Sequence, residues 1–273
     1  MKVAYLGPKG TYTYGACLKH FGKDIQLGAL NSIAEVFEEV EARKFDYGVL
    51  PIENSSEGAV THTFDCLGNS SLVICHEIEM KIEHSLVCAP GEDCAEIKWV
   101  YSHPQALAQC RQWLRKYYPQ AIQLTFTSTT VAIEEMLNHR SCAAIASSHA
   151  IEHYDLKTVS QGINDRLENI TRFLVLGHKI TAKRTGHDKT SLMLAQENKP
   201  GSLVKILLPF AEENVNLTRI ESRPDLRKIW HYVFFVEMDG HIEDENIKKV
   251  LKKLQMQKVT VKILGSYSKA APC

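Results

Sequence analysis

Residues 169–176 read NITRFLVL, a polar start followed by an apolar run that is typical of a buried β-strand. Side chains alternate along a strand, so Thr171 and Phe173 are expected on one face and Arg172 on the other. A buried guanidinium needs an anion, which either the protein or a ligand supplies. An edge strand that leaves Arg172 in solvent is the alternative. The stretch therefore offers a hydroxyl, a guanidinium and an aromatic ring close together.

Upstream of this strand, the chain repeats a pattern in which a short apolar stretch leads into an amphipathic helix. Strands are expected at residues 3–6, 27–30, 47–52, 72–78, 85–89, 97–101, 122–126 and 142–146, and helices at about 11–21, 32–40, 58–67, 104–114 and 128–137. Two helix starts show capping-box spacing: Ser32 with Glu35, and Ser102 with Gln105. Alternation of this kind predicts an α/β fold with parallel sheets flanked by helices.

Small hydroxyl side chains recur where these strands turn into helices. They are Thr11 and Thr13, Ser55 and Ser56, Ser102, and Ser128 with Thr129 and Thr130. Ser and Thr are good helix caps, which explains each turn singly. Helix N-termini also attract anions, and in open α/β sheets these turns lie where ligands bind. Their recurrence favours an anion-binding cleft between two α/β lobes, with Arg172 as its fixed cation.

The composition excludes several classes of protein. Lys+Arg and Asp+Glu are both 32, so the zero net charge argues against nucleic acid or a membrane surface as partner. No apolar run approaches the ~18 residues of a membrane span, and the first residues show no signal-peptide pattern. The eight cysteines lack zinc-type spacing and are expected as reduced thiols, and the twelve histidines form no metal-binding motif. We therefore expect a cytoplasmic protein without a metal or other cofactor.

The last third of the chain follows a different pattern. Residues 181–188 are polar and basic and are expected to form a linker. Beyond them, strands are expected at 190–195, 215–222, 230–238 and 259–264, and helices at 200–210 and 244–254, with a kink at Pro209. This order is βαββαβ, the ferredoxin-like arrangement. We expect residues 1–180 to form the first domain, with lobe one at about 1–77 plus 162–180 and lobe two at about 78–161, and residues 189–273 to form the second.

Several motifs, in order and at plausible spacing, resemble those of the prephenate dehydratase family. They are GPKGTYT at 7–13, PIENS at 51–55, SHPQ at 102–105 and TRF at 171–173. The C-terminal region resembles the ACT regulatory domain of that family, through PGSLV at 200–204 and ESRP at 221–224. Two departures are small: Tyr12-Thr13 stands where the family usually has phenylalanine-serine, and Ser202 where alanine is common.

The resemblance implies a two-lobed catalytic domain of the type II periplasmic-binding-protein kind, followed by an ACT domain. It also implies a carbon–oxygen lyase that converts prephenate to phenylpyruvate, with loss of carbon dioxide and water, in L-phenylalanine biosynthesis. Two alternatives stay open: an arogenate dehydratase, and a non-catalytic two-lobed protein that binds an amino acid or another carboxylate. No cofactor is required by this chemistry.

The resemblance assigns catalytic roles to three residues. Thr171 would donate a hydrogen bond to the leaving hydroxyl, and Arg172 would bind a substrate carboxylate. Phe173 would pack against the substrate ring, or it would be a plain core residue. Residues expected to bind substrate, each of which could instead be a helix cap, are Thr11, Thr13, Asn54, Ser55, Ser102, Gln105 and Thr129.

The ACT domain would bind phenylalanine as an allosteric inhibitor. The expected effector-binding residues are Gly201, Ser202, Leu203, Val204, Asn216, Leu217, Glu221, Ser222 and Arg223. Gly201 would let the backbone approach the amino acid closely. Arg223 could instead pair with Glu221 or Asp225 and hold the turn. ACT domains usually pair across subunits, so we expect a homo-oligomer, a dimer or a tetramer.

Overall fold

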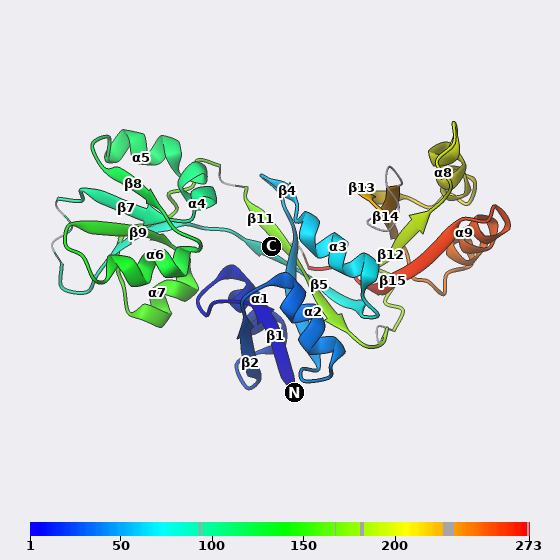
Figure 1. Cartoon of the computed structure of the whole chain (residues 1–273), viewed down its shortest axis with the longest axis horizontal. Helices are drawn as coiled ribbons and strands as arrows, with labels where there is room; N and C mark the ends of the chain where they lie inside the picture. The colour runs from blue at the N-terminus through cyan, green and yellow to red at the C-terminus, as the bar shows by residue number, and fades with distance from the viewer. Residues whose placement is uncertain (93, 95, 167, 181–182, 226–231, 272) are drawn as a thin grey trace.

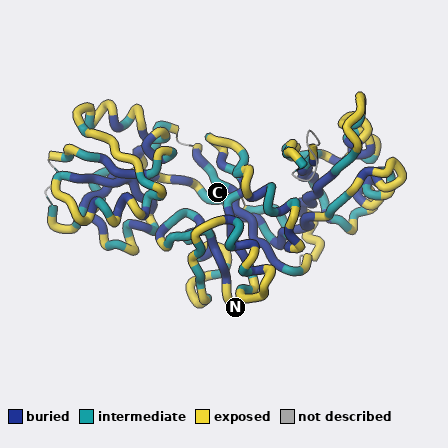
Figure 2. Tube along the Cα trace, viewed as in Figure 1, coloured by how far each residue is buried: buried dark blue, intermediate teal, exposed yellow. Residues whose placement is uncertain are grey.

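The computed structural model describes the 273-residue chain except for residues 93, 95, 167, 181–182, 226–231 and 272. Figure 1 shows three units side by side: lobe two at the left, lobe one in the centre and the C-terminal domain at the right. The chain enters lobe two after β5 (Val73–Lys81) and returns through β11 (Ile170–Gly177). Figure 2 shows the central strands of each unit buried and the outer faces of the helices exposed.

Lobe one is built on the strands β5-β11-β3-β1-β2, which form one end of a ten-stranded sheet that continues into the C-terminal domain. Its further strands are β1 (Lys2–Leu6), β2 (Gln26–Leu30) and β3 (Tyr47–Asn54), with β4 (Gly58–Ala59) paired to β3, and its helices are α1 (Tyr12–Phe21), α2 (Ile33–Glu41) and α3 (Thr61–Asn69). β1 runs parallel to β2 and β3, whereas β11 is antiparallel to β3 and β5. The helix expected from residue 58 therefore begins only at Thr61.

Helix α2 has the N-terminal cap and the buried apolar stripe that the sequence predicted. Ser32 Oγ accepts a hydrogen bond from the Glu35 N–H at 3.1 Å, so the predicted cap is confirmed. Val36, Phe37 and Val40 lie on its buried stripe, against Leu174 and Leu176 of β11 and other members of the same core. Burying such apolar side chains contributes about 1.5–3 kcal/mol each.

Lobe two has a second sheet with the order β10-β6-β9-β7-β8. Its elements are β6 (Ser85–Cys88), β7 (Trp99–Ser102), α4 (Pro104–Gln109), α5 (Arg111–Tyr117), β8 (Ile122–Thr125), α6 (Thr129–Met136), β9 (Cys142–Ala146), α7 (Ser148–Tyr154) and β10 (Lys157–Ser160). The single helix expected at 104–114 is divided at Cys110. His103, whose Nδ1 accepts from the Gln105 N–H, caps α4, so the predicted cap at Ser102 is wrong.

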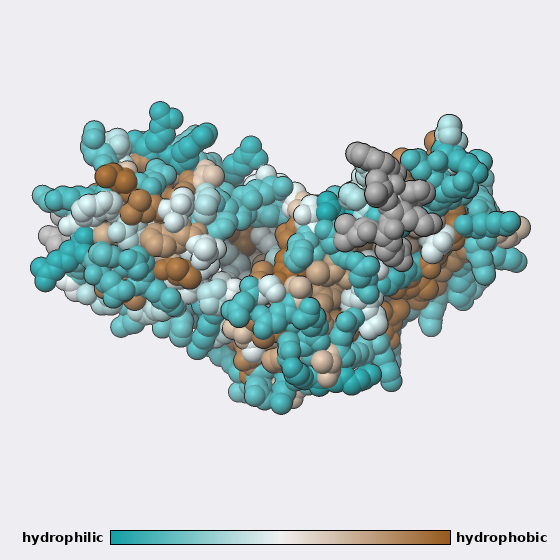
Figure 3. Space-filling view, in the orientation of Figure 1, coloured by the Kyte–Doolittle hydropathy of each residue, from teal (hydrophilic) through white to brown (hydrophobic). Residues whose placement is uncertain are grey.

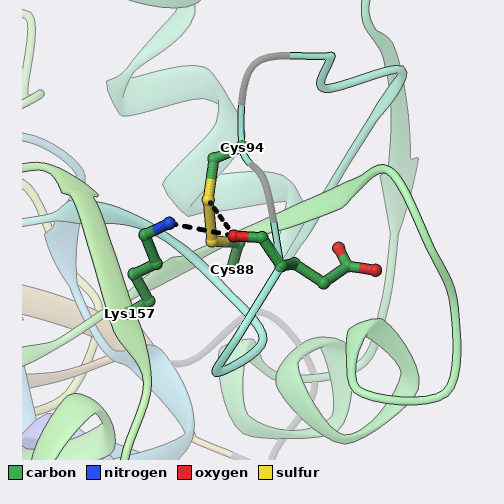
Figure 4. The surroundings of a disulfide bond; sticks show 4 residues. Cys88, Cys94 and Lys157 are labelled. Atoms are coloured by element: carbon green, nitrogen blue, oxygen red, sulfur yellow. Dashed lines mark hydrogen bonds between the residues drawn. A yellow bond between two sulfur atoms is a disulfide. The ribbon is translucent and has the colours of Figure 1, made fainter.

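Cys88 and Cys94 are joined by a disulfide beside β6 (Figure 4). The carbonyl of Glu92 lies next to it and accepts a hydrogen bond from Lys157 Nζ at 2.9 Å. The expectation that all eight cysteines are reduced thiols is therefore wrong for these two. Five residues separate the two cysteines in the sequence, a spacing that matches no common cysteine motif and so gave no sign of the pair.

The C-terminal domain has the predicted βαββαβ order. Its elements are β12 (Asp188–Ala195), α8 (Ser202–Glu212), β13 (Leu217–Pro224), β14 (Tyr232–Asp239), α9 (Glu245–Met256) and β15 (Thr260–Ser268), with the antiparallel strand order β13-β14-β12-β15. Pro209 lies inside α8, which continues to Glu212. The strand start expected at Trp230 and the linker residues Thr181 and Ala182 lie outside the described residues.

The C-terminal sheet has two covered faces. One packs against α8 and α9, for example through Leu192 and Phe210. The other packs against α3 of lobe one, where the rings of Phe64 and Phe235 lie 5.1 Å apart. β15 also meets β5 at Gly265, where a Cβ atom would collide with the carbonyl oxygen of Ile74. The domain is therefore docked on lobe one through an extensive contact.

Candidate active site

Thr171 and Asn54 form the centre of the candidate site, where the end of β3 pairs with the start of β11. Asn54 Oδ1 accepts from the backbone N–H groups of Ser56, at 2.9 Å, and Glu57, at 3.2 Å. This fixes the orientation of the amide, so Asn54 Nδ2 donates to Thr171 Oγ1 at 2.9 Å. Because the Thr171 oxygen accepts this bond, its own O–H remains available to donate to another group.

A chain of uncharged side chains extends from Asn54 into lobe two. Asn54 Nδ2 also donates to Asn169 Oδ1 at 2.7 Å, and Asn169 Nδ2 donates to Gln109 Oε1 at 3.0 Å. His84 Nε2 lies 2.9 Å from the same Gln109 oxygen. We call Asn54, Asn169, Gln109 and His84 the amide chain. It ties the start of β11 to α4, so it fixes Thr171 relative to both lobes.

His84 fits this chain as a neutral imidazole. Burial lowers its pKa, and the hydrogen bond to Gln109 only partly opposes that effect. Its Nε2–H then donates to Gln109, while Nδ1 lies 3.1 Å from the hydroxyl of Tyr12. Burial raises the pKa of Tyr12 well above its ordinary value, so this phenol stays protonated. The four members of the amide chain are therefore uncharged, and the Glu57 carboxylate, which accepts from Gln109 Nε2 at 3.1 Å, helps to orient them.

The two lobes also touch at the turn that precedes α1. Ser147 Oγ donates to the carbonyl of Gly10 at 2.8 Å. Gly10 has a φ of 88°, and a Cβ there would lie 3.3 Å from Ala150 Cα, so a glycine suits this close approach. Figure 3 shows the surface hollowed between lobe two and lobe one. Thr11, which caps α1 through the Tyr14 N–H at 3.3 Å, and Thr13, which is buried, follow this turn.

The remaining predicted substrate-binding residues have different surroundings. Ser55 Oγ accepts from the Ile170 N–H at 2.9 Å and so holds the start of β11. Ser102 is fully buried, with its hydroxyl 3.5 Å from the Ile145 carbonyl. Gln105 lies in the first turn of α4, and Thr129 is the first residue of α6. Asn54 and Ser55 therefore lie at the start of β11 beside Thr171, whereas Ser102 lies in the interior of lobe two.

Arg172 faces away from this site. Its guanidinium contacts Glu237 of β14 through two bonds of 2.6 and 3.0 Å, Glu77 of β5 at 3.1 Å and Glu53 of β3 at 2.9 Å. Burial disfavours the charged guanidinium, but these carboxylates, Glu237 foremost, outweigh it and raise the pKa of Arg172. The protein itself supplies the anion that the sequence pattern required, so the expected role of Arg172 as the fixed cation of the cleft does not agree with the structure.

Phe173 belongs to the hydrophobic core. It is 1 % exposed and packs in one cluster with Val3, Tyr5, Ala16 and Val175. This is the plain core role that the sequence left open, and it does not agree with a ring wall for the substrate. Phe173 instead holds β11 against α1.

The predicted effector-binding residues lie on two sides of the C-terminal sheet. Gly201, Ser202, Leu203 and Val204 line a cavity of about 220 Å³ together with Tyr232 and Phe234. Arg223 instead makes a two-bond pair with Asp65 of α3, at 3.0 and 2.8 Å, and Glu221 lies 3.6 Å from Arg219. Asn216 donates to Asp239 at 2.9 Å, Leu217 packs against the core below α8 and α9, and Ser222 is exposed on β13.

Sequence reasoning missed three members of the amide chain. Asn169 stands two residues before Thr171, a spacing that places both on one face of a strand. Gln109 follows Gln105 by four residues on a helix, which also gives a shared face. These signals were present in the sequence. His84 precedes β6 and carried no comparable signal.

The fold and the site together define a two-lobed α/β ligand-binding protein with a docked ferredoxin-like domain. Within the described part of the chain, no group of three or more His, Cys, Asp or Glu side chains is placed to hold a metal. No helix of that same part combines the length and the apolar character needed to cross a membrane.

Family models identify the two parts. The model for prephenate dehydratase matches residues 3–181, and the model for the ACT domain matches residues 190–255. The chain therefore belongs to the prephenate dehydratase family, a family of lyases, and carries an ACT domain.

Individual relatives agree. The chain is 44% identical over 270 residues to a bifunctional chorismate mutase/prephenate dehydratase of Pseudomonas aeruginosa, which covers 99% of this chain and 74% of that protein. It is 38% identical to the prephenate dehydratase of Methanocaldococcus jannaschii, over 97% of both chains. The crystal structure of an Arthrobacter aurescens prephenate dehydratase in complex with L-Phe matches with a TM-score of 0.91 and 32% identity, over 98% of this chain and 90% of that one.

Proposed function

We propose that this chain decarboxylates and dehydrates prephenate to phenylpyruvate in L-phenylalanine biosynthesis, with Thr171 as the catalytic donor. In this reaction the bond between the ring and its carboxylate breaks and releases carbon dioxide. The electron pair enters the ring as the opposite C–O bond breaks, and the leaving hydroxyl takes up a proton to depart as water. Formation of an aromatic ring provides the driving force. The protein has to hold the dianion and assist the departing hydroxyl.

The hydrogen bond from Asn54 to Thr171 is the observation that carries this proposal. It leaves the Thr171 O–H to donate to the departing hydroxyl, and it polarises that O–H because linked hydrogen bonds strengthen one another. A threonine hydroxyl is too weak an acid for full proton transfer at neutral pH. Thr171 therefore acts by a hydrogen bond that strengthens as negative charge develops on the leaving oxygen.

The carboxylates of the substrate need partners other than Arg172. Thr11 and Thr13 at the start of α1, and Thr129 at the start of α6, remain our candidates, together with Ser55 and Gln105. Backbone N–H groups in the first turn of a helix are free to bind an anion, and the helix dipole favours negative charge there. Ser102, which is fully buried, would act by shaping the start of α4.

We infer that phenylalanine is an allosteric inhibitor bound by the ACT domain, as in the feedback control of a pathway by its product. The solved relative in complex with L-Phe supports this, as does the cavity beside Gly201, which Tyr232 and Phe234 line with aromatic rings. A change of Gly201 and Leu203 to bulky polar residues should weaken phenylalanine binding at least tenfold in equilibrium dialysis. Unchanged binding would place the effector elsewhere.

The same face of the ACT domain supports assembly. Leu203, Val204 and Leu208 of α8 are 41%, 67% and 48% exposed, an apolar surface suited to a second copy of the chain. We infer a cytoplasmic homo-oligomer, a dimer or a homotetramer. We also keep the division proposed above, with lobe one at about 1–77 plus 162–180, lobe two at about 78–161, a linker at 181–188 and the ACT domain at 189–273.

A substrate comparison tests the proposed function. Purified protein is incubated with prephenate and, separately, with arogenate, and phenylpyruvate and phenylalanine are followed with and without added phenylalanine. We expect phenylpyruvate from prephenate and inhibition by phenylalanine. Turnover of arogenate alone would identify an arogenate dehydratase. Binding of either compound without turnover would show a carboxylate-binding protein and refute the enzyme.

A further inference from the structure

Two neighbouring residue pairs on β3 and β11 face opposite sides of the sheet. In the register of these strands, Thr171 pairs with Asn54 and the next residue, Arg172, pairs with Glu53. Thr171 and Asn54 are hydrogen-bonded to each other at the candidate site. Arg172 and Glu53 are joined by an ion pair of 2.9 Å and face the ACT domain. Thr171 and Asn54, which we call the catalytic pair, therefore each have a charged neighbour in sequence, Arg172 and Glu53, that contacts the ACT domain.

The ACT domain forms ion pairs with both charged neighbours, Arg172 and Glu53. Glu237 of β14 binds the Arg172 guanidinium through two bonds, and Arg219 of β13 makes an ion pair of 2.6 Å with Glu53, without hydrogen-bond alignment. Arg219 also lies over the ring of Phe64 on α3, 4.8 Å from its centroid. Two strands of the ACT domain, β13 and β14, thus each hold one residue next to the pair Thr171 and Asn54.

A third link joins these residues into one charged cluster. Lys189 of β12 contacts Glu77 of β5 at 2.7 Å, and Glu77 in turn contacts Arg172. The cluster, which we call the junction cluster, consists of three cations and three carboxylates: Arg172, Lys189, Arg219, Glu53, Glu77 and Glu237. All of their side chains except that of Glu53 are 10% exposed or less.

Separating one member of the junction cluster from its partners is energetically unfavourable. Burial would raise the pKa of Glu237, but Arg172, followed by Lys189 and Arg219, outweighs it and holds the pKa below its ordinary value. Removing one member of such a buried group leaves an unpaired charge, which is strongly unfavourable. We therefore expect a movement of β13 and β14 to displace Arg172 and Glu53 instead of being absorbed between the two domains.

We propose that Arg172 and Glu53 are positioning residues, which Glu237 and Arg219 hold so that the placement of Thr171 and Asn54 depends on how the ACT domain is seated. This proposal rests on the proposed function. The clamped arrangement of this structure, with the Asn54–Thr171 bond intact, is the competent one. An effector that favours a different seating of the ACT domain would shift Arg172 and Glu53, and with them the hydroxyl that assists the leaving group.

The test compares two variants at the same domain contact. Glu237→Gln removes the charge that holds Arg172, whereas Lys262→Met removes another ACT-domain cation, whose Nζ donates to the carbonyls of Leu67 and Ser70 at 2.9 and 2.6 Å. Lys262 lies on β15 and these carbonyls lie at the end of α3, so this variant perturbs the domain contact at elements other than β3 and β11. Steady-state kinetics with prephenate, equilibrium binding of phenylalanine and thermal unfolding are measured for both.

We expect Glu237→Gln to lower kcat roughly 10- to 100-fold, because a misplacement of about 1 Å in a reacting group costs on that order. Its KM for prephenate and its affinity for phenylalanine should stay within about threefold, while inhibition by phenylalanine falls below about twofold. Lys262→Met should lose thermal stability and keep both kcat and inhibition. Arg219→Met, which releases Glu53 instead, serves as a second variant and should lower kcat in the same direction.

The outcomes separate this proposal from the function on which it rests. Wild-type protein that does not turn over prephenate overturns both. Active wild type with an unchanged kcat in both Glu237→Gln and Arg219→Met overturns the positioning role alone. An equal loss of kcat in Lys262→Met would also overturn it, since the effect would then come from general loosening of the domain contact.

Discussion

Removing the Thr171 hydroxyl is expected to abolish most of the activity without unfolding the protein. In Thr171→Val the side chain keeps its shape, but the leaving hydroxyl of the substrate loses its donor. Loss of one such donor costs about 2.7–4 kcal/mol of transition-state stabilisation, which is a fall of roughly 10²–10³ in kcat. Asn54 Nδ2 also loses an acceptor at 2.9 Å. Asn54 is buried and its Nδ2 keeps the bond to Asn169, so the one N–H left without an acceptor would cost about 1–3 kcal/mol of stability.

The matched control is Thr171→Ser, which keeps the hydroxyl and loses only the methyl group. Phenylpyruvate formation is followed under saturating prephenate, and thermal unfolding shows that each variant is folded. The serine variant should keep kcat within about tenfold of wild type, whereas the valine variant should lose at least about a hundredfold. A folded valine variant with a kcat within about threefold of wild type would refute the donor role of Thr171.

Other parts of the structure give further expected outcomes. Asn169→Leu breaks the amide chain between Asn54 and Gln109, so kcat should fall roughly tenfold while the circular dichroism spectrum is unchanged; an unchanged kcat would mean that the chain does not position Thr171. The pKa of His84 is lowered from 6.5 by burial, so its contribution to stability is complete above that pH and is lost as the pH falls toward the folded-state value. In urea titrations at decreasing pH, His84→Gln should therefore lose less unfolding free energy below pH 6.5 than wild type, and an identical loss would contradict this. Gly265→Ala should destabilise the protein by about 1–3 kcal/mol, because the added methyl meets the carbonyl of Ile74, whereas Gly68→Ala, with its nearest neighbour at 3.4 Å, should not destabilise it.

Much of the fold could be predicted because each element carries its own local signal. The stripe of Val36, Phe37 and Val40 has helical spacing, and the run from Leu174 to Leu176 reads as a buried strand. The βαββαβ order of the last domain followed from the same rules. The errors fall where a local choice had close competitors: His103 instead of Ser102 caps α4, and Gly58 enters a short strand before α3 begins.

The site was predicted less completely, for a physical reason. The partners of Arg172 include Glu237, which lies 65 residues further along the chain and in another domain, and no local pattern reveals such a contact. One warning was available in the sequence, since adjacent residues on a strand point to opposite faces. Thr171 and Arg172 were therefore poorly placed to share one cleft. Asn169, by contrast, had the spacing to join Thr171.

The central claim is that Asn54 donates to Thr171 and so leaves the hydroxyl proton for the substrate. Asn54→Asp tests it most directly, because the side chain keeps its shape and its acceptor for the Ser56 N–H, but it can now only accept from Thr171. The measurement is the single-turnover rate of phenylpyruvate formation by the folded variant. We expect this rate to fall at least about a hundredfold below that of the wild type. A rate within about threefold of wild type would contradict the account, because the Thr171 proton would then not be needed by the leaving group.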